Sequence, residues 1–357
     1  MRIDAHHHLW TLARGDYGWL TSELAPIYRD FRLADLAPHL AAADIEGTIL
    51  VQAAPTEAET LFLLDIADNT ELVRGVVGWT DFDATDAVAR IDALAARNLL
   101  VGLRPMVQDI ADDDWLLGPR LTPLLAAMAR HDLVFDALVL PRHLPKLLEV
   151  IDRHPDLTFV LDHCGKPRLA AGETATWQRD IALLAEYPNI VCKLSGLVTE
   201  AAPNWQIADL RQAVDHVLAS FGPQRLQWGS DWPVVNLAGG YAKWFAATKT
   251  LLADLSPDEK AAIFVEGRQL SANDADHLGD EFTYLPAGER DSRKCVVKMC
   301  GFFIPSRQFA INGLEFLVVG PKRGQCLVPL SGKRCTLDGN RRVDGQNTKQ
   351  IDVGEGV

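Results

Sequence analysis

The sequence predicts a (β/α)8 TIM barrel with an atypical C-terminal tail, and three observations support this fold class. Short β-rich runs alternate with Ala/Leu-rich segments of helical periodicity, as in successive βα units. The polar residues that interrupt the apolar runs stand at their C-terminal ends, where a barrel carries its active site. The chain has 357 residues and is 48% hydrophobic, so it can bury one large core.

Counted in order, the β-rich runs number eight, which is the number of strands in this barrel. They are Arg2 to Trp10, Gly47 to Ala53, Val73 to Thr80, Leu100 to Pro105, Leu133 to Leu140, Thr158 to His163, Ile190 to Leu194 and Leu226 to Ser230. Between them, apolar residues near i, i+3 and i+4 predict amphipathic helices, clearest over residues 84–98, 121–131, 144–154, 177–186 and 207–221. A doubly wound sheet is the competing architecture, but no Gly-x-Gly-x-x-Gly follows the first run, which argues against dinucleotide binding.

The composition changes near residue 290. Residues 1–289 carry 23 Lys and Arg against 42 Asp and Glu, a net charge of −19, whereas residues 290–357 carry 12 against 6, a net charge of +6. All nine tryptophans lie at or before Trp244, and four of the six cysteines follow residue 290. We therefore divide the chain into a barrel, residues 1–270, and a C-terminal extension, residues 271–357.

Three interpretations of the extension are open. Its apolar stretches, Ile311 to Gly320 and Cys326 to Leu330, are compatible with a small appended β segment. Its four cysteines offer thiolate ligands for a structural zinc ion, although their spacing differs from that of known zinc sites. The interpretation that we favour is a poorly ordered, non-native C-terminus, for example one read from a shifted frame.

The overall charge favours a small-molecule substrate. A formal net charge of −13 leaves no dominant basic face, which argues against a nucleic acid or an anionic membrane as partner. No apolar run is long enough to span a bilayer and no signal peptide precedes the first run, so we expect a cytoplasmic protein. The six cysteines form no disulfide framework. The oligomeric state stays open.

Polar groups at the ends of the runs mark the candidate site. The first run ends in three histidines, and alternation along a strand places His6 and His8 on one face and His7 on the other. Two imidazoles on one face are typical of a metal site. The later runs contribute Arg104, Asp136, His163, Lys193 and Asp231.

These motifs resemble the amidohydrolase superfamily, in its branch of sugar-lactone hydrolases that includes fuconolactone, rhamnonolactone and sulfomuconolactone hydrolases. The matching segments are IDAHHHLW (3–10), VGLRP (101–105), PRHLP (141–145), LDHCGKP (161–167) and WGSDWP (228–233). An isolated His-x-His is weak evidence, but its combination with a downstream histidine and a final aspartate in this order is specific. The resemblance covers residues 2 to about 265 and does not extend to the tail.

The resemblance implies that water attacks a lactone carbonyl in carbohydrate metabolism, with Asp231 as general base and then general acid, supported by His163 and Arg104. His6, His8, His163 and Asp231 would hold one divalent metal, with zinc suiting imidazole and carboxylate. The same groups, with Arg104 or Lys193 as cationic polariser, could also act without metal. Arg104 and Asp136 depart from the two-metal pattern of the superfamily, so we expect one ion or none.

Five further residues are expected to contact substrate: Trp10, Asp136, His143, Lys193 and Trp232. Each also has a structural interpretation, since aromatic residues at a barrel mouth pack, charged residues pair, and a histidine in a loop is ordinary. Asp162 is interpreted as a structural residue of the barrel wall. Cys164 and Cys192 are expected to be buried apolar residues.

Two other classes of function are kept beside lactone hydrolysis. A decarboxylase of the same superfamily uses a similar set of His and Asp residues on a carbon–carbon bond, and it releases carbon dioxide instead of opening a lactone. A non-catalytic or defective barrel is the second alternative, because an altered C-terminus would uncover apolar surface.

Overall fold

The computed structural model describes residues 1–264 and five strands of the C-terminal segment, 308–311, 314–319, 326–329, 335–337 and 341–343. The chain divides into two compact units, Met1–Ala275 and Asp276–Val357. The boundary predicted at residue 270 lies outside the described residues and stays a prediction.

The first unit is a barrel of eight parallel strands in the order β1 to β8, which confirms the predicted fold class. Its strands are β1 (Ile3–His7), β2 (Gly47–Val51), β3 (Val73–Gly78), β4 (Leu100–Leu103), β5 (Val134–Ala137), β6 (Phe159–Leu161), β7 (Ile190–Leu194) and β8 (Leu226–Trp228). Each lies within its predicted run. Most end earlier than predicted, because the residues that follow turn across the mouth of the barrel.

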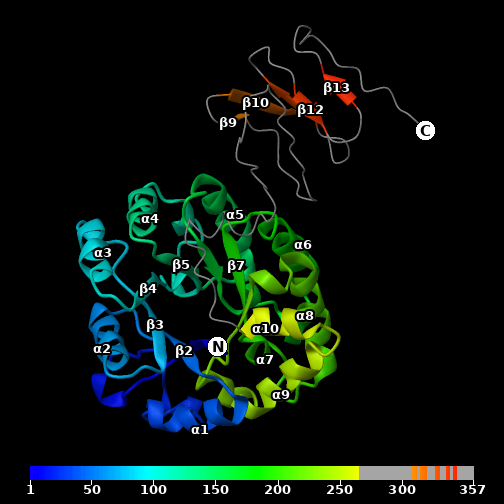
Figure 1. Ribbon diagram of the computed structural model, residues 1–357. Coiled ribbons are helices and arrows are strands. Elements are labelled where there is room, and N and C mark those ends of the chain that lie inside the picture. The colour runs from blue at the N-terminus through cyan, green and yellow to red at the C-terminus, as the bar shows by residue number, and fades with distance from the viewer. Residues whose placement is uncertain (265–307, 312–313, 320–325, 330–334, 338–340, 344–357) are drawn as a thin grey trace. The chain divides into compact units, whose positions relative to one another are not determined.

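Helices surround the strands in chain order, as the colour sequence around the ring shows (Figure 1). They are α1 (Leu33–Ala43), α2 (Glu57–Asp68), α3 (Ala87–Ala95), α4 (Leu121–Arg130), α5 (Leu144–Arg153), α6 (Ala175–Leu184), α7 (Leu197–Glu200), α8 (Ile207–Phe221), α9 (Tyr241–Leu251) and α10 (Pro257–Phe264). Apolar side chains between the helices and the strands form the main core. None of the described helices has the length and apolar character needed to cross a bilayer.

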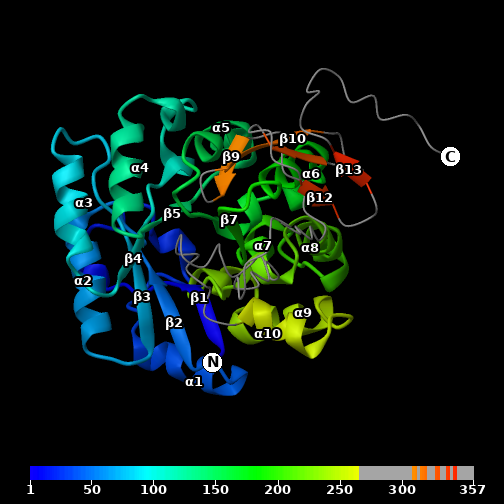
Figure 2. The same ribbon diagram turned by 45° about the horizontal axis from the view of Figure 1, so that its top comes forward.

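The barrel closes between β1 and the segment that follows β8. The Asp231 N–H donates to the His6 carbonyl at 2.8 Å, and the His8 N–H donates to the Trp232 carbonyl at 2.6 Å. Figure 2 shows β1 beside β2 and β3 at the start of this ring. The two closing hydrogen bonds therefore join the backbone segments that carry the predicted ligands.

The inside of the barrel is layered. Val134, Val160 and Val191 form a small apolar cluster separate from the main core. Two residues further along β5 and β7, alternation brings Asp136 and Lys193 to the same face. Asp136 and Lys193 thus lie nearer the carboxyl ends of the strands than the valine cluster does.

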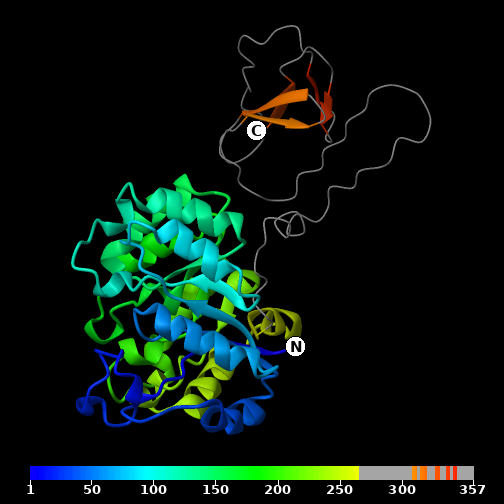
Figure 3. The same cartoon turned by 90° about the vertical axis from the view of Figure 1, so that its left-hand side faces the viewer.

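Helix α10 lies beside the amino end of β1, as the three views agree (Figures 1, 2 and 3). The ring of Phe264 is 5.3 Å from that of Trp228 in β8, centroid to centroid, and the Arg2 guanidinium lies 5.3 Å from its centre. This helix therefore covers the end of the barrel opposite the predicted site.

The second unit contains two small antiparallel sheets. One pairs β10 (Leu314–Val319) with β9 (Gln308–Ile311) and β11 (Cys326–Pro329), and the other pairs β12 (Cys335–Leu337) with β13 (Arg341–Val343). Strands β10 and β11 lie in the two stretches predicted to be compatible with β structure. The cysteine side chains on which the zinc hypothesis depends lie outside the described residues, as do most residues of the extension.

Candidate active site and metal centre

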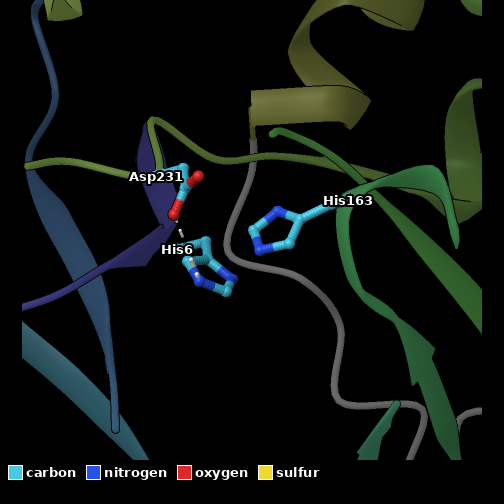
Figure 4. A group of neighbouring side chains, drawn as sticks. All are labelled: His6, His163 and Asp231. Carbon is cyan, nitrogen blue, oxygen red and sulfur yellow. Dashed lines mark ion pairs between the residues drawn. The ribbon is translucent and has the colours of Figure 1, made fainter. Parts of the chain in front are cut away.

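Three predicted ligands meet at the mouth of the barrel. His6 is in β1, His163 follows β6 and Asp231 follows β8, and one ligand atom from each lies within 4.8 Å of the others. All three are buried. In Figure 4, the Asp231 carboxylate points toward His6, and the His163 ring approaches from the opposite side. These three residues form a possible buried metal site.

His8 completes the cluster. Its Nε2 lies 3.1 Å from His6 Nε2 and 3.4 Å from Asp231 Oδ1, while His6 Nε2 lies 3.8 Å from the same oxygen. His7 points away, as predicted, because its Nε2 contacts the Thr48 hydroxyl at 2.9 Å. The alternation of the His-His-His run thus separates two site histidines from one structural histidine.

The outer nitrogen of each site histidine has a fixed partner. His8 Nδ1 lies 2.8 Å from the Val51 carbonyl, and His6 Nδ1 lies 3.2 Å from the Asp162 carboxylate. Because both oxygens only accept, we assign a proton to each Nδ1, although His6 Nδ1 also faces the Lys193 ammonium at 3.3 Å; this assignment leaves lone pairs on both Nε2 atoms. His163 Nδ1 lies 2.9 Å from the Ser195 hydroxyl, which orients the third ring.

This donor set fits a divalent metal. Two Nε2 lone pairs facing each other at 3.1 Å repel unless a cation or proton lies between them. The donor separations among His6, His8 and Asp231, 3.1 to 3.8 Å, match atoms sharing one zinc ion at roughly 2.0–2.2 Å each. Histidines held by a carboxylate and a backbone carbonyl are usual around zinc.

The site also favours the protonation states that bind metal. Burial lowers the pKa of His163 to about 4, despite the nearby Asp231, and lowers that of His6 well below its usual value. Burial alone would raise the pKa of Asp231, but His163 and the contact with His8 hold it well below its usual range. At neutral pH His6 and His163 are therefore neutral imidazoles and Asp231 is a carboxylate, which are the forms that bind a metal.

The backbone is strained at two of the ligands. His163 has φ 51° and Asp231 has φ 56°, which is the left-handed region that costs free energy for residues other than glycine. Gly196 provides the space for the first: a Cβ there would lie 2.5 Å from His163 Cγ. Gly229 likewise leaves space for His6, a ligand with ordinary backbone, because a Cβ at position 229 would lie 2.6 Å from the His6 Cβ. Strain held by packing is typical of functional sites.

A charged network lies behind the histidines. The Lys193 ammonium contacts Asp136, and it lies 3.0 Å from Asp162 Oδ1 and 3.3 Å from His6 Nδ1. Arg104 donates to the other oxygen of Asp162 at 2.9 Å and to the Gln52 carbonyl. Two buried cations thus balance two buried carboxylates.

This network shifts the pKa values of the two carboxyl groups in opposite directions. Burial would raise the pKa of Asp162, but Lys193 and His6 hold it well below its usual value. Burial and the Asp162 charge raise the pKa of Asp136 to about 7. Asp162 is therefore the permanent carboxylate that orients His6.

Asp162 is the site residue that the sequence interpretation missed. The sequence predicts a structural residue of the barrel wall, yet Asp162 contacts His6, Arg104 and Lys193 inside the barrel. The signal was present in the sequence, because alternation continued from Val160 in β6 places Asp162, the first residue after the strand, on the inner side of the barrel.

Three other residues predicted to contact substrate already have partners within the protein. His143 Nδ1 accepts the Leu140 N–H at 3.2 Å and its Nε2 faces Asp113 at 3.3 Å, so both ring nitrogens have partners. Trp10 and Trp232 are buried and meet edge to face with Phe31. Substrate contacts of these residues, and of Arg104, Asp136 and Lys193, stay predictions. Cys164 and Cys192 are buried free thiols, as expected.

Comparison with known proteins identifies similar sequences. The amidohydrolase family matches residues 3–266. An L-fucono-1,5-lactonase of Burkholderia ambifaria is 47% identical over 267 residues, covering 74% of this chain and 92% of that protein. An L-fucono-1,5-lactonase of Burkholderia multivorans is 38% identical over 260 residues, covering 68% of this chain and 85% of that protein.

A similar solved structure comes from the same genus. It is a Burkholderia multivorans amidohydrolase crystallised with bound zinc, 35% identical, with a TM-score of 0.71 over 76% of this chain and 99% of that one. The matched segment holds all of the predicted site residues and ends before the C-terminal extension begins.

Proposed function

Because the chain belongs to the amidohydrolase family, we propose that it is a lactonase, a hydrolase that opens a small sugar-derived lactone with Asp231 as general base. The observation that carries the proposal is the cluster of His6, His8, His163 and Asp231 at the barrel mouth. Its similarity to two L-fucono-1,5-lactonases supports a sugar lactone as the substrate class.

The roles of the residues follow from their contacts. A zinc ion held by His6, His163 and Asp231, with His8 beside them, would polarise the lactone carbonyl and activate water. Asp231 faces His6 and His8 with Oδ1, so we assign the proton transfer to its other oxygen, Oδ2. Asp231 is ionised at neutral pH, so the form that accepts a proton is present. Its low pKa makes it a weak base, and the greater acidity of a zinc-activated water would favour the transfer.

The ring opens in the second half of the reaction. Water adds to the carbonyl carbon, the bond from that carbon to the ring oxygen breaks, and Asp231 returns its proton to the leaving oxygen. The product is a hydroxy acid. Lys193 and Arg104 keep Asp162 ionised, and Asp162 in turn fixes the His6 ring for the whole cycle.

Acid release from a panel of sugar lactones, together with elemental analysis for zinc, tests the proposal. We expect Asp231→Asn to lower kcat by about 10²- to 10⁴-fold, which is the usual contribution of a general base. Asp44→Asn is the matched control, since Asp44 also has a left-handed backbone, with φ 53°, but is exposed at the end of α1. An Asp231→Asn enzyme with unchanged turnover would refute this assignment, and carbon dioxide as the product would point to a decarboxylase.

A further inference from the structure

The end of β2 and the turn after it hold three side chains, two of them at the candidate site, through three consecutive carbonyls. The Val51 carbonyl accepts from His8 Nδ1 at 2.8 Å, and the Gln52 carbonyl accepts from Arg104. The Ala53 carbonyl accepts from the indole N–H of Trp19 at 2.7 Å. The position of this turn therefore sets the orientation of a site histidine, of a cation of the charged network and of a partly exposed tryptophan.

The turn itself is fixed by one buried carboxylate. Glu59 accepts the Ala54 N–H at 2.7 Å and the Ala53 N–H at 3.0 and 3.1 Å, and its side chain is fully buried. Burial raises the pKa of Glu59 to about 7, against the lowering effect of these two N–H groups. A buried carboxylate is costly, so its retention needs a reason beyond filling space.

The sequence around Glu59 shows that this contact is unusual. Thr56 caps α2 by accepting the Glu59 N–H at 3.1 Å, so Thr56 to Glu59 has the T-x-x-E pattern of a capping box. In a capping box the glutamate returns to the N–H of the capping residue. Here the Thr56 N–H donates to the Ala54 carbonyl instead, and Glu59 reaches past it to the turn. The glutamate therefore stabilises the end of β2 rather than the start of its own helix.

We propose that Glu59 is a positioning residue of the active site, which acts on His8, Arg104 and Trp19 through the backbone of residues 51–54. It touches none of the proposed ligands. Its carboxylate fixes the Ala53 and Ala54 amides, and the carbonyls of the same turn fix the side chains. The inference rests on the proposed function only for its activity readout.

The test compares Glu59→Gln with Glu57→Gln, two residues earlier in the same helix. Glu57 accepts from Thr80 and Arg90 away from the turn, so its variant controls for the loss of a charge near the start of α2. Gln at 59 turns an amide N–H toward a backbone N–H, which loosens the turn. The first readout is the ring Nδ1–H signal of His8 in ¹⁵N–¹H spectra of the metal-free protein, assigned by its loss in His8→Gln. It needs neither lactone nor zinc.

We expect a slowly exchanging His8 signal in wild type and in Glu57→Gln, and its loss in Glu59→Gln. Zinc affinity and kcat/KM should fall at least about tenfold in Glu59→Gln and stay within about twofold in Glu57→Gln, as for loss of a partner around a metal ligand. Glu59→Asp, which keeps the charge but shortens the reach, should lie between them, and it decides the question if Glu59→Gln does not fold.

An unchanged His8 signal and unchanged zinc affinity in Glu59→Gln would overturn the proposal, even with a lower Tm, because Glu59 would then be merely structural. A wild-type protein without the protected His8 signal would also overturn it. Absence of lactone turnover in wild type would instead refute the proposed function, and the His8 signal would still decide the role of Glu59.

Discussion

At the scale of single residues, a glycine decides whether His163 fits. Gly196 has φ 64°, and an added Cβ would lie 2.6 Å from His163 Nδ1, the atom that faces Ser195. The histidine cannot move away freely, because its own backbone is in the left-handed region. The orientation of a proposed ligand therefore depends on the absence of a methyl group in the turn after the neighbouring strand, β7.

Gly196→Ala is expected to displace the His163 ring, weaken zinc binding and lower kcat/KM at least about tenfold, as the loss of a metal ligand's support does. Gly172→Ala is the control, since Gly172 has φ 68° but open space where the Cβ would be. Both variants carry the same backbone penalty of roughly 1–2 kcal/mol. Equal losses of activity in the two would show that strain alone, and not the clash, is responsible. Zinc titration and steady-state kinetics measure the difference.

Some site residues could be predicted from the sequence and others could not. His6, His8, His163 and Asp231 were predicted as ligands because chemically distinctive groups recur at strand ends, and the structure brings them together. Asp162 was missed although alternation indicated its face, because its role depends on partners in or directly after other strands, His6, Arg104 and Lys193. The contact of the Glu59 carboxylate with the Ala53 and Ala54 N–H groups could not be predicted either. The T-x-x-E pattern alone suggests an ordinary helix cap.

At the scale of elements, the existence and order of the eight strands were predictable, and their ends were not. Alternation and apolar runs indicate where a strand lies, but a strand ends where the next hydrogen-bonded neighbour ends. In β6 the predicted run continued to His163, whereas the strand ends at Leu161 and the chain turns through Asp162 to Gly165. The functional residues lie in these turns, so the errors fall in the region that carries the chemistry.

Helix α10 is the element whose packing is most easily tested. Phe264 contacts Trp228 and Phe245, with ring centroids 5.3 and 5.9 Å apart, at the amino end of the barrel. Phe264→Ala should lower the free energy of unfolding by about 3–5 kcal/mol, the usual cost of emptying a buried aromatic site. Leu183→Ala, at an exposed position of α6, should change it by less than about 0.5 kcal/mol. Urea denaturation measures both, and equal values would mean that α10 contributes little to the barrel.

At the scale of the whole molecule, the family match and the first compact unit cover nearly the same residues, 3–266 and Met1–Ala275. All proposed ligands and the Glu59 turn lie inside both. The acidic barrel and the basic extension therefore differ in composition, in family membership and in compactness.

A chain that ends at Ala275 is expected to keep its zinc content, and its kcat/KM should stay within about twofold of the full chain, because a compact unit with its own core can fold alone. Light scattering and lactone kinetics on the two proteins check this. Aggregation of the shorter chain, under conditions where the full chain stays dispersed, would show that the extension is part of the fold.

The closure of the barrel has a consequence for how the protein matures during synthesis. The hydrogen bonds between Asp231 and His6, and between His8 and Trp232, join the beginning of the chain to a segment made more than two hundred residues later. A ribosome-bound chain that has not yet reached Asp231 cannot form the ligand cluster, however well its first strands have paired. Zinc binding would therefore require synthesis to have passed Asp231. Chains that end before this residue should lose the ion, and chains that extend beyond the barrel should retain it.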